Sequence, residues 1–272
     1  MGKFDGIIIC TDLDDTLLTS DKIVSEENKE AIKYFMDEGG IFTYATGRVL
    51  KTSKMIFEHT VPNAPIIACN GVIIYDAVKD KILWSLELDS DYKKIMDAVK
   101  DKFPDCGMYA YTLEGEQFIS RNSLTDWYIN YAGLDGKIVK TSDINDPAYK
   151  VVFFQQEEKM DELCEFVHSL GESKKFNFSK SEPVYFEMLP KGAGKGEALL
   201  ELAKMLGIDK NKTIGTGNYE NDISLVRDAG VGVAVANAIS SVLDVADYIT
   251  VDHNNHAIKA IIEAIEKGTI KM

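Results

Sequence analysis

Several features that characterise other classes of protein are missing from this chain of 272 residues. No uninterrupted apolar segment approaches the roughly 20 residues that a membrane-spanning helix requires. Residues 1–6 lead directly into an apolar segment and show no pattern of a signal or transit peptide. No cysteines occur in a Cys-x-x-Cys pair, and their apolar surroundings predict buried free thiols at Cys10, Cys69, Cys106 and Cys164. We therefore expect a cytoplasmic protein without a membrane partner.

Positive charge is also scarce. The chain has 30 lysines and arginines against 44 aspartates and glutamates, which gives a formal net charge of −14. Nucleic acids and anionic membranes select for clusters of Lys and Arg, so neither is an expected partner. A small phosphorylated metabolite remains possible, because a few locally placed cations suffice to bind it. The length favours two domains of ordinary size.

Strand-like and helix-like segments alternate at both ends of the chain. Apolar runs at residues 7–10, 41–46 and 213–216 are separated by amphipathic helical segments. This alternation predicts an α/β core domain with a parallel sheet and helices on both faces, built from residues 1–85 and 189–272. Residues 86–188 have shorter, aromatic-rich strands, which predicts an inserted α+β domain with helices on one face of an antiparallel sheet. Its core is predicted to include Tyr109, Tyr111, Trp127 and Tyr128.

The first apolar run ends in three carboxylates, of which Asp12 and Asp14 are the most informative. Ligands of open α/β sheets bind outside the carboxyl ends of the strands. Alternate residues near a strand end can face the same side, so both carboxylates can meet one ligand. Clustered anions repel each other unless a cation or proton joins them, and this pair therefore predicts a Mg²⁺ site. The alternative is a solvated acidic turn.

Thr46 and Gly47 close the second buried strand. A hydroxyl with nearby backbone N–H groups can hold a phosphate, although a turn that requires Gly explains the pair equally well. Lys195 begins a later helix, where the free N–H groups also favour anions. The nucleotide P-loop pattern fails there, because Leu189 replaces a Gly and Gly196 replaces a Ser or Thr.

A polar segment at residues 217–222 follows another strand. Asp222 alone is explained as a helix cap, and Lys195 alone as a surface residue. Polar residues at the ends of several parallel strands are harder to explain as unrelated caps, so their combination predicts one site. His253 and His256 lie in a polar loop without a third metal ligand, and we expect them to be solvated or to cap a helix.

Four of these segments, taken in order, resemble the motifs of the haloacid dehalogenase (HAD) superfamily. They are residues 12–18 (Asp-Leu-Asp-Asp-Thr-Leu-Leu), 45–48 (Ala-Thr-Gly-Arg), 195–199 (Lys-Gly-x-Ala-Leu) and 217–222 (Gly-Asn-x-x-Asn-Asp). The Asn70-Gly71-x-Ile73 segment and the position of the insertion resemble the Cof-type, subclass IIB, sugar-phosphate phosphatases. The resemblance implies a Rossmann-like, HAD-like core with an inserted α+β cap of the C2 type. One position departs from the family pattern, because Asn218 stands where an aspartate usually binds the metal.

The resemblance also implies a reaction, the Mg²⁺-dependent hydrolysis of small phosphate monoesters, such as sugar phosphates, through an aspartyl-phosphate. Asp12 is then the nucleophile and Asp14 the general acid and base. The implied phosphate and substrate ligands are Leu13, Thr46, Gly47, Arg48, Asn70, Lys195 and Asn221. The implied metal ligands and their support are Asp12, Asp14, Asn218 and Asp222. A phosphomutase on the same scaffold and a non-catalytic phosphometabolite-binding protein are the alternatives, and the sequence carries no signal for an oligomeric state.

Overall fold

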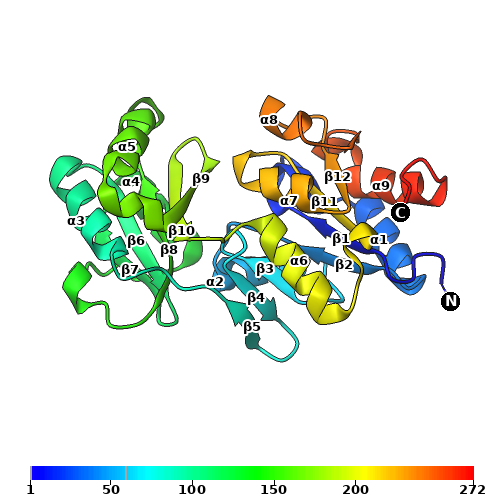
Figure 1. Cartoon of the computed structure of the whole chain (residues 1–272), viewed down its shortest axis with the longest axis horizontal. Helices are drawn as coiled ribbons and strands as arrows, with labels where there is room; N and C mark the ends of the chain where they lie inside the picture. The colour runs from blue at the N-terminus through cyan, green and yellow to red at the C-terminus, as the bar shows by residue number, and fades with distance from the viewer. Residues whose placement is uncertain (1, 59) are drawn as a thin grey trace. The chain divides into compact units, whose positions relative to one another are not determined.

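The computed structural model describes residues 2–58 and 60–272 of the chain, which form two compact units. One unit comprises Met1–Trp84 and Gly194–Met272, and the other comprises Ser85–Ala193 (Figure 1). The second unit is therefore an insertion within the first. Among the described residues, no helix has both the length and the apolar character to cross a membrane.

The interrupted unit is built on a parallel sheet of five strands in the order β13-β12-β11-β1-β2. β1 lies between β11 and β2 and runs parallel to both. All four residues of β1 are buried, as expected for a strand covered on both faces. This arrangement confirms the predicted α/β fold. The strands are β1 (Ile8–Thr11), β2 (Ile41–Tyr44), β11 (Thr213–Gly217), β12 (Val231–Ala234) and β13 (Tyr248–Ile249).

Helices cover this sheet with their apolar sides. Leu199 and Leu202 of α6 and Leu225 of α7 belong to the same buried cluster as Ile8 and Cys10 of β1. The helices α1 and α9 pack against each other. The helices of this unit are α1 (Glu26–Asp37), α2 (Leu50–Lys54), α6 (Lys195–Leu206), α7 (Ile223–Asp228), α8 (Ser240–Leu243) and α9 (Ala257–Glu266).

The segment after β2 departs from the predicted alternation of strands and helices. β3 (Ile66–Ala68) is joined to the end of β2 by a parallel bridge between Ala45 and Ile67. β4 (Ile73–Asp76) then pairs antiparallel with β3, and β5 (Lys81–Ser85) completes this small sheet. The four residues that join β3 to β4 are too few for a parallel crossover. Cys69, Asn70 and Gly71 all have positive φ, at 54°, 57° and 89°, and so reverse the chain.

The inserted unit contains an antiparallel sheet of five strands in the order β7-β6-β8-β10-β9. Val151 and Phe153 of β8 share a buried cluster with residues of α3 and α5, so these helices cover one face. Because strand side chains alternate, Lys150 and Val152 face the other side. The elements are α3 (Tyr92–Lys102), β6 (Gly107–Thr112), β7 (Gly115–Ser120), α4 (Ser123–Ala132), β8 (Ala148–Phe154), α5 (Glu157–Ser169), β9 (Phe176–Glu182) and β10 (Tyr185–Pro190).

Aromatic residues on α4 show where the predicted core of this unit was right and where it was wrong. Tyr109 of β6 is buried and stacks on Tyr128 of α4, with ring centroids 5.5 Å apart. Tyr109 alternates with Met108, which belongs to the α3 and α5 cluster, so α4 packs on the second face of the sheet. Trp127 is not a core residue, because 58% of it is exposed and it stacks on Tyr131 of the next helical turn. Helices thus lie on both faces of this sheet.

Candidate active site

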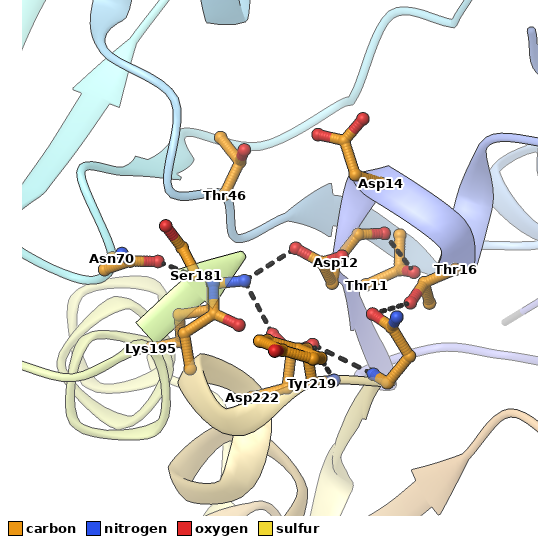
Figure 2. Close-up of polar contacts among 12 residues, drawn as sticks. Thr11, Asp12, Asp14, Thr16, Thr46, Asn70, Ser181, Lys195, Tyr219 and Asp222 are labelled. Carbon is orange, nitrogen blue, oxygen red and sulfur yellow. Dashed lines mark hydrogen bonds and ion pairs between the residues drawn. The ribbon is translucent and has the colours of Figure 1, made fainter. Parts of the chain in front are cut away.

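The carboxyl ends of β1, β2 and β11 meet at one edge of the parallel sheet. Thr11, the last residue of β1, is paired with Tyr44 of β2 and Thr216 of β11. Asp12 follows directly, and its N–H donates to the carbonyl of Thr216 at 2.8 Å, which continues the ladder by one residue. The sheet therefore fixes the backbone of Asp12, and only 6% of the residue is exposed. Figure 2 shows its side chain among the polar groups of this edge.

Lys195 lies between the carboxylates of Asp12 and Asp222. Its Nζ is 2.6 Å from Asp12 Oδ1 and 2.6 Å from Asp222 Oδ1, and the residue is completely buried (Figure 2). Burial lowers the pKa of Lys195, but the two carboxylates outweigh that effect and hold the pKa above its usual value. Burial and the charge of Asp222 raise the pKa of Asp12 to about 7. The cluster is thus a buried cation shared by two acids.

A close backbone approach brings Lys195 to this position. Gly71, in the turn between β3 and β4, lies against the residue before α6, so a Cβ there would be 2.0 Å from the carbonyl oxygen of Gly194 and 2.8 Å from the backbone nitrogen of Lys195. Gly71 also has φ of 89°, a conformation that residues with a side chain rarely adopt. Only glycine lets the start of α6 pack against this turn.

Asp222 organises the loop that follows β11. Its second carboxylate oxygen, Oδ2, accepts hydrogen bonds from the N–H groups of Asn218 and Tyr219 at 2.9 Å and 3.1 Å. Both oxygens of Asp222 are therefore used within the protein. Across from it, Asn218 Oδ1 accepts a hydrogen bond from the Thr16 hydroxyl at 3.1 Å, which ties this loop to the segment after β1.

Asp14 is held in an ion pair with Arg48. The Nε of Arg48 donates to Oδ2 at 3.0 Å and its second terminal nitrogen donates to Oδ1 at 2.8 Å, a two-pronged contact typical of Arg and carboxylate. Lys22 approaches the same carboxylate at 3.6 Å. Burial raises the pKa of Asp14, but the Arg48 hydrogen bonds and charge outweigh it and leave the pKa below its usual value. In this arrangement Asp14 is ionised.

The remaining predicted ligands are joined by contacts with one another and with Arg48. Thr46 is buried, and its hydroxyl accepts the N–H of Arg48 at 3.1 Å. Asn221 donates its side-chain nitrogen to Asn70 Oδ1 at 3.0 Å. Asn70 is 1% exposed, and its own Nδ2 has no hydrogen-bond partner among the residues that the structure describes. A Cβ on Gly47 would be 3.0 Å from Asn70 Oδ1, so Gly47 also lies against this group.

Two residues complete the comparison with the sequence-based predictions. Leu13 is fully buried beside Asp12, and its carbonyl accepts the N–H of Leu18 at 2.9 Å. Contacts join most of the predicted residues in three sets. These are Lys195 with Asp12, Asp222 and Asn218, Arg48 with Asp14 and Thr46, and Asn70 with Asn221 and Gly47. Thr16 was missed as a site residue, although it lies inside the acidic motif and its hydroxyl is a signal that the sequence contains.

Oxygen atoms dominate the candidate metal ligands. Lys195 contacts one oxygen of Asp12, and Thr16 fixes the side-chain oxygen of Asn218. Hard cations such as Mg²⁺ prefer oxygen ligands of this kind. Within residues 2–58 and 60–272 no three His, Cys, Asp or Glu side chains are grouped so that they could hold a metal. The donors proposed from the sequence, the Asp12 carboxylate and the Asn218 amide oxygen, therefore fit Mg²⁺ by chemical type.

Comparison with known proteins gives consistent matches over nearly the whole chain. The family of haloacid dehalogenase-like hydrolases matches residues 9–262. The chain is 28% identical to the 5-amino-6-(5-phospho-D-ribitylamino)uracil phosphatase YcsE of Bacillus subtilis over 247 residues, covering 89% of each chain. It is 27% identical to the phosphatase YwpJ of the same organism, covering 92% of this chain and 96% of the relative.

Solved structures show the same fold. The structure of TM0651 from Thermotoga maritima covers 94% of this chain and 96% of its own, with 25% identity and a TM-score of 0.77. The HAD subclass IIB sugar phosphatase BT4131 covers 96% of this chain and 99% of its own, with 19% identity and a TM-score of 0.80. These two matches show that the chain shares the fold of both structures. This chain belongs to the family of haloacid dehalogenase-like hydrolases.

Proposed function

We propose that this phosphatase hydrolyses small phosphate monoesters with the help of Mg²⁺ and through a phosphorylated Asp12. The observation that carries the proposal is the contact of Lys195 Nζ with Asp12 and Asp222, at 2.6 Å each. A nucleophilic carboxylate needs a neighbouring cation before it can approach an anionic phosphate, and a buried lysine provides one without exposure to water. The relatives named as phosphatases support the same reaction class.

In the first step, a carboxylate oxygen of Asp12 attacks phosphorus in line with the leaving oxygen. The new bond joins Asp12 to phosphorus, and the bond from phosphorus to the alcohol oxygen breaks. A carboxyl proton of Asp14 passes to that oxygen, so an alcohol leaves. In the second step Asp14 takes a proton from water, the resulting hydroxide attacks phosphorus, and inorganic phosphate departs from Asp12. Splitting the reaction in this way replaces one difficult displacement by two easier ones.

Asp14 must change partner between the resting protein and the first step. The Arg48 pair holds Asp14 ionised, which suits the removal of a proton from water but not the donation of a proton. The phosphate of an incoming substrate is itself an anion that competes for the Arg48 guanidinium. We infer that substrate binding draws Arg48 from Asp14 and allows the carboxyl group to be protonated.

Several groups are available for the phosphoryl oxygens. We assign Thr46, Lys195 and the backbone N–H groups of Leu13 and Gly47 to the phosphoryl oxygens when substrate is bound. Asn70, which the family resemblance also implies as a ligand, belongs to this set, because its buried Nδ2 is a donor without a partner among the described residues. Donors already in position stabilise the charge that spreads over the oxygens in the transition state.

A Mg²⁺ ion would be held by Asp12, the backbone carbonyl of Asp14 and the side-chain oxygen of Asn218. When bound, it would reduce the repulsion between the nucleophile and the phosphate. Asp222 would support this site indirectly, by holding the backbone of residues 218 and 219. The place of Asn218 in this set is supported by the Thr16 hydrogen bond, which fixes the orientation of the amide.

We further propose that residues 86–188 serve as the C2-type cap and contact the part of the substrate beyond the phosphate. The relative YcsE is named for a substrate that joins a phosphorylated ribityl chain to a uracil ring. A small phosphorylated sugar or polyol derivative is therefore the substrate class that we propose. The free thiols of Cys10, Cys69, Cys106 and Cys164 agree with a reducing cytoplasm.

The test is phosphate release from a panel of sugar, polyol and aryl phosphates, with Mg²⁺ and with excess EDTA. We expect turnover that depends on Mg²⁺, and a loss of at least about 10³-fold in the Asp12→Asn variant. Asp21→Asn is the matched control, because it removes an exposed carboxylate from the turn after the motif. Saturable binding of a phosphorylated metabolite without any turnover would refute the proposal in favour of a binding protein.

A second measurement tests the role of Asp14. In single turnovers, Asp14→Asn should slow the phosphorylation step with alkyl phosphates much more than with p-nitrophenyl phosphate, whose leaving group needs little protonation. An equal loss with both substrates would remove Asp14 from the role of general acid while leaving the nucleophile assignment intact.

A further inference from the structure

A loop that is distant in sequence forms a hydrogen bond to the backbone of residues 12–18, the segment that contains Asp12 and Asp14. Asn237 lies in the loop after β12, and its Nδ2 donates to the backbone carbonyl of Asp15 at 2.9 Å. Its Oδ1 accepts the backbone N–H of His253 at 3.0 Å. In the same loop, the N–H of Ile239 donates to the carbonyl of Asn218 at 3.0 Å. This loop therefore contacts both polar segments of the candidate active site.

The residue that Asn237 holds has an unusual backbone conformation. Asp15 has φ of 55° and ψ of 24°, in the left-handed region that residues other than glycine rarely occupy. Such a conformation persists only where the surroundings enforce it, and it is frequent at functional sites. Asp14, directly before it, also departs from helical values, with ψ of 125°. The direction of the Asp14 side chain therefore depends on how the backbone of Asp15 is held.

The carboxylate of Asp15 and the turn after the motif are tied to the same side. Lys22 lies 3.1 Å from Asp15 Oδ1, and His253 Nε2 lies 3.9 Å from it. Ser20 donates its N–H to Asn254 Oδ1 at 3.0 Å and its hydroxyl lies 3.1 Å from His253 Nε2. His253 and His256 were expected to be solvated or to cap a helix. The side chain of His253 is only 12% exposed, whereas His256 is the N-cap residue of α9. The turn that contains Ser20 and Lys22 is therefore hydrogen-bonded to the loop at residues 253–255.

Hydrogen bonds also fix both ends of the segment 12–18. A change in the backbone of Asp15 must therefore be compensated by dihedral changes within this segment. Asp12 is fixed by the strand ladder, and the N–H of Leu18 is bonded to the carbonyl of Leu13. A rotation of the Asp15 peptide must then be compensated by neighbouring dihedrals, and Asp14 is the adjacent residue. Active-site geometry is sensitive to such shifts, since a displacement of about 1 Å can reduce a rate by about a hundredfold.

We propose that Asn237 is a positioning residue for Asp14, acting through its hydrogen bond to the carbonyl of Asp15. The inference rests on the proposed function of Asp14 as the general acid. Asn237 touches no reacting atom in this scheme, and its effect reaches the substrate only through the direction of the Asp14 carboxyl group.

The test is the Asn237→Asp variant, because a carboxylate keeps the acceptor for the His253 N–H and loses the donor to Asp15. We expect the phosphorylation rate with alkyl phosphates to fall by about ten- to a hundredfold, and the rate with p-nitrophenyl phosphate to fall much less. A role in folding alone would reduce both rates equally. If Asn237→Asp does not fold by circular dichroism, Asn237→Ala removes the same donor without adding a charge.

Asn63 offers a matched control at the opposite end of the sheet. Its Nδ2 donates to the carbonyl of Gly40 at 3.0 Å and its Oδ1 accepts the N–H of Phe42 at 2.8 Å, so it makes the same kind of bridge at the start of β2. Asn63→Asp should lower stability without changing the ratio of the alkyl and aryl rates. Equal changes of that ratio in both variants would overturn the proposal.

A double-mutant cycle with Asp14→Asn completes the test. Once Asp14 is no longer an acid, Asn237→Asp should cause no further loss with alkyl phosphates. If its effect multiplies that of Asp14→Asn in full, Asn237 does not act through Asp14 and the inference fails. Absence of turnover in the unmodified protein would instead refute the proposed function, so the two failures are distinguishable.

Discussion

Replacement of Lys195 by methionine is expected to expose how strongly the active site depends on one buried cation. Methionine fills a similar volume without a charge, so the change leaves the carboxylates of Asp12 and Asp222 buried with no partner cation. Both contacts that are lost have a length of 2.6 Å, and Lys195 is completely buried. Breaking a buried ion pair by removing one partner typically costs about 3–5 kcal/mol. We expect a loss of unfolding free energy of about that size at neutral to alkaline pH.

The loss should depend on pH in a defined direction. In the native protein the pKa of Asp12 is raised from its ordinary value to about 7, so the folded state binds more protons than the unfolded state between pH 3.8 and that value. Stability from this group is complete below pH 3.8 and is lost as pH rises towards 7. Without Lys195, whose charge lowers the pKa of Asp12, the folded pKa moves higher and the loss continues to higher pH. The difference between native protein and variant must therefore be larger at pH 8 than at pH 5.

Tryptophan fluorescence allows the unfolding of the interrupted unit to be measured separately from that of the inserted unit. The two tryptophans are divided between the units, with Trp84 in one and Trp127 in the other. Trp127 is 58% exposed, so Trp127→Phe should leave the fold intact and make Trp84 the single reporter. Urea titrations of this protein, with and without Lys195→Met, give the unfolding free energies at pH 5 and pH 8.

Two results would contradict the reasoning. A stability difference below about 1 kcal/mol at pH 8 would mean that the acids do not depend on Lys195. A difference that becomes smaller from pH 5 to pH 8 would mean that the pKa of Asp12 is not raised in the folded state. Turnover should also be lost in this variant by about 10²–10³-fold, as for other donors that stabilise transition-state charge.

Three further changes test other parts of the structure. Asn218→Asp should lower the Mg²⁺ concentration for half-maximal rate, because a carboxylate adds charge attraction to the site, and an unchanged titration would show that residue 218 is not a ligand. Gly71→Ala should lower both activity and the unfolding temperature, since its Cβ would be 2.0 Å from the carbonyl of Gly194, whereas an unchanged protein would refute that close approach. Lys150→Met should destabilise the inserted unit by about 3–5 kcal/mol. The reason is that it leaves the buried Glu187 carboxylate, whose Oε2 is 2.8 Å from Lys150 Nζ, without its partner cation. Trp127 fluorescence would follow that unfolding, and a loss under about 1 kcal/mol would contradict it.

The sequence alone was sufficient to predict the α/β class of the fold and the edge of the sheet where Asp12, Lys195 and Asp222 meet. The physical reason is that a run of buried strand residues that ends in polar groups marks the carboxyl end of a central strand. Residues 7–12 show this pattern, and the structure places Asp12 at the end of β1 with its N–H still in the sheet ladder. The family of the chain also follows from its motifs, since they are local segments in a fixed order.

Tertiary structure decided which of these residues touch one another. Lys195 Nζ meets Asp12 Oδ1 across 183 positions of sequence, and Gly71 permits that approach only because of its place against Gly194. The antiparallel pairing of β3 and β4 depended on three consecutive positive φ angles, which no hydrophobic pattern records. Arg48 was expected to bind substrate, and only the tertiary structure shows that it also pairs with Asp14 and lowers the pKa of that carboxyl.

Asn237 had no signal in the sequence at all, because an exposed asparagine in a loop is ordinary on any surface. Its hydrogen bond to the carbonyl of Asp15 joins residues 222 positions apart. Local patterns report propensity and periodicity over a few residues, so they identify the strand end at which Asp12 and Asp14 lie. The side chain that holds the backbone beside these carboxylates comes from wherever the folded chain brings a donor within about 3 Å, and only the tertiary structure determines that.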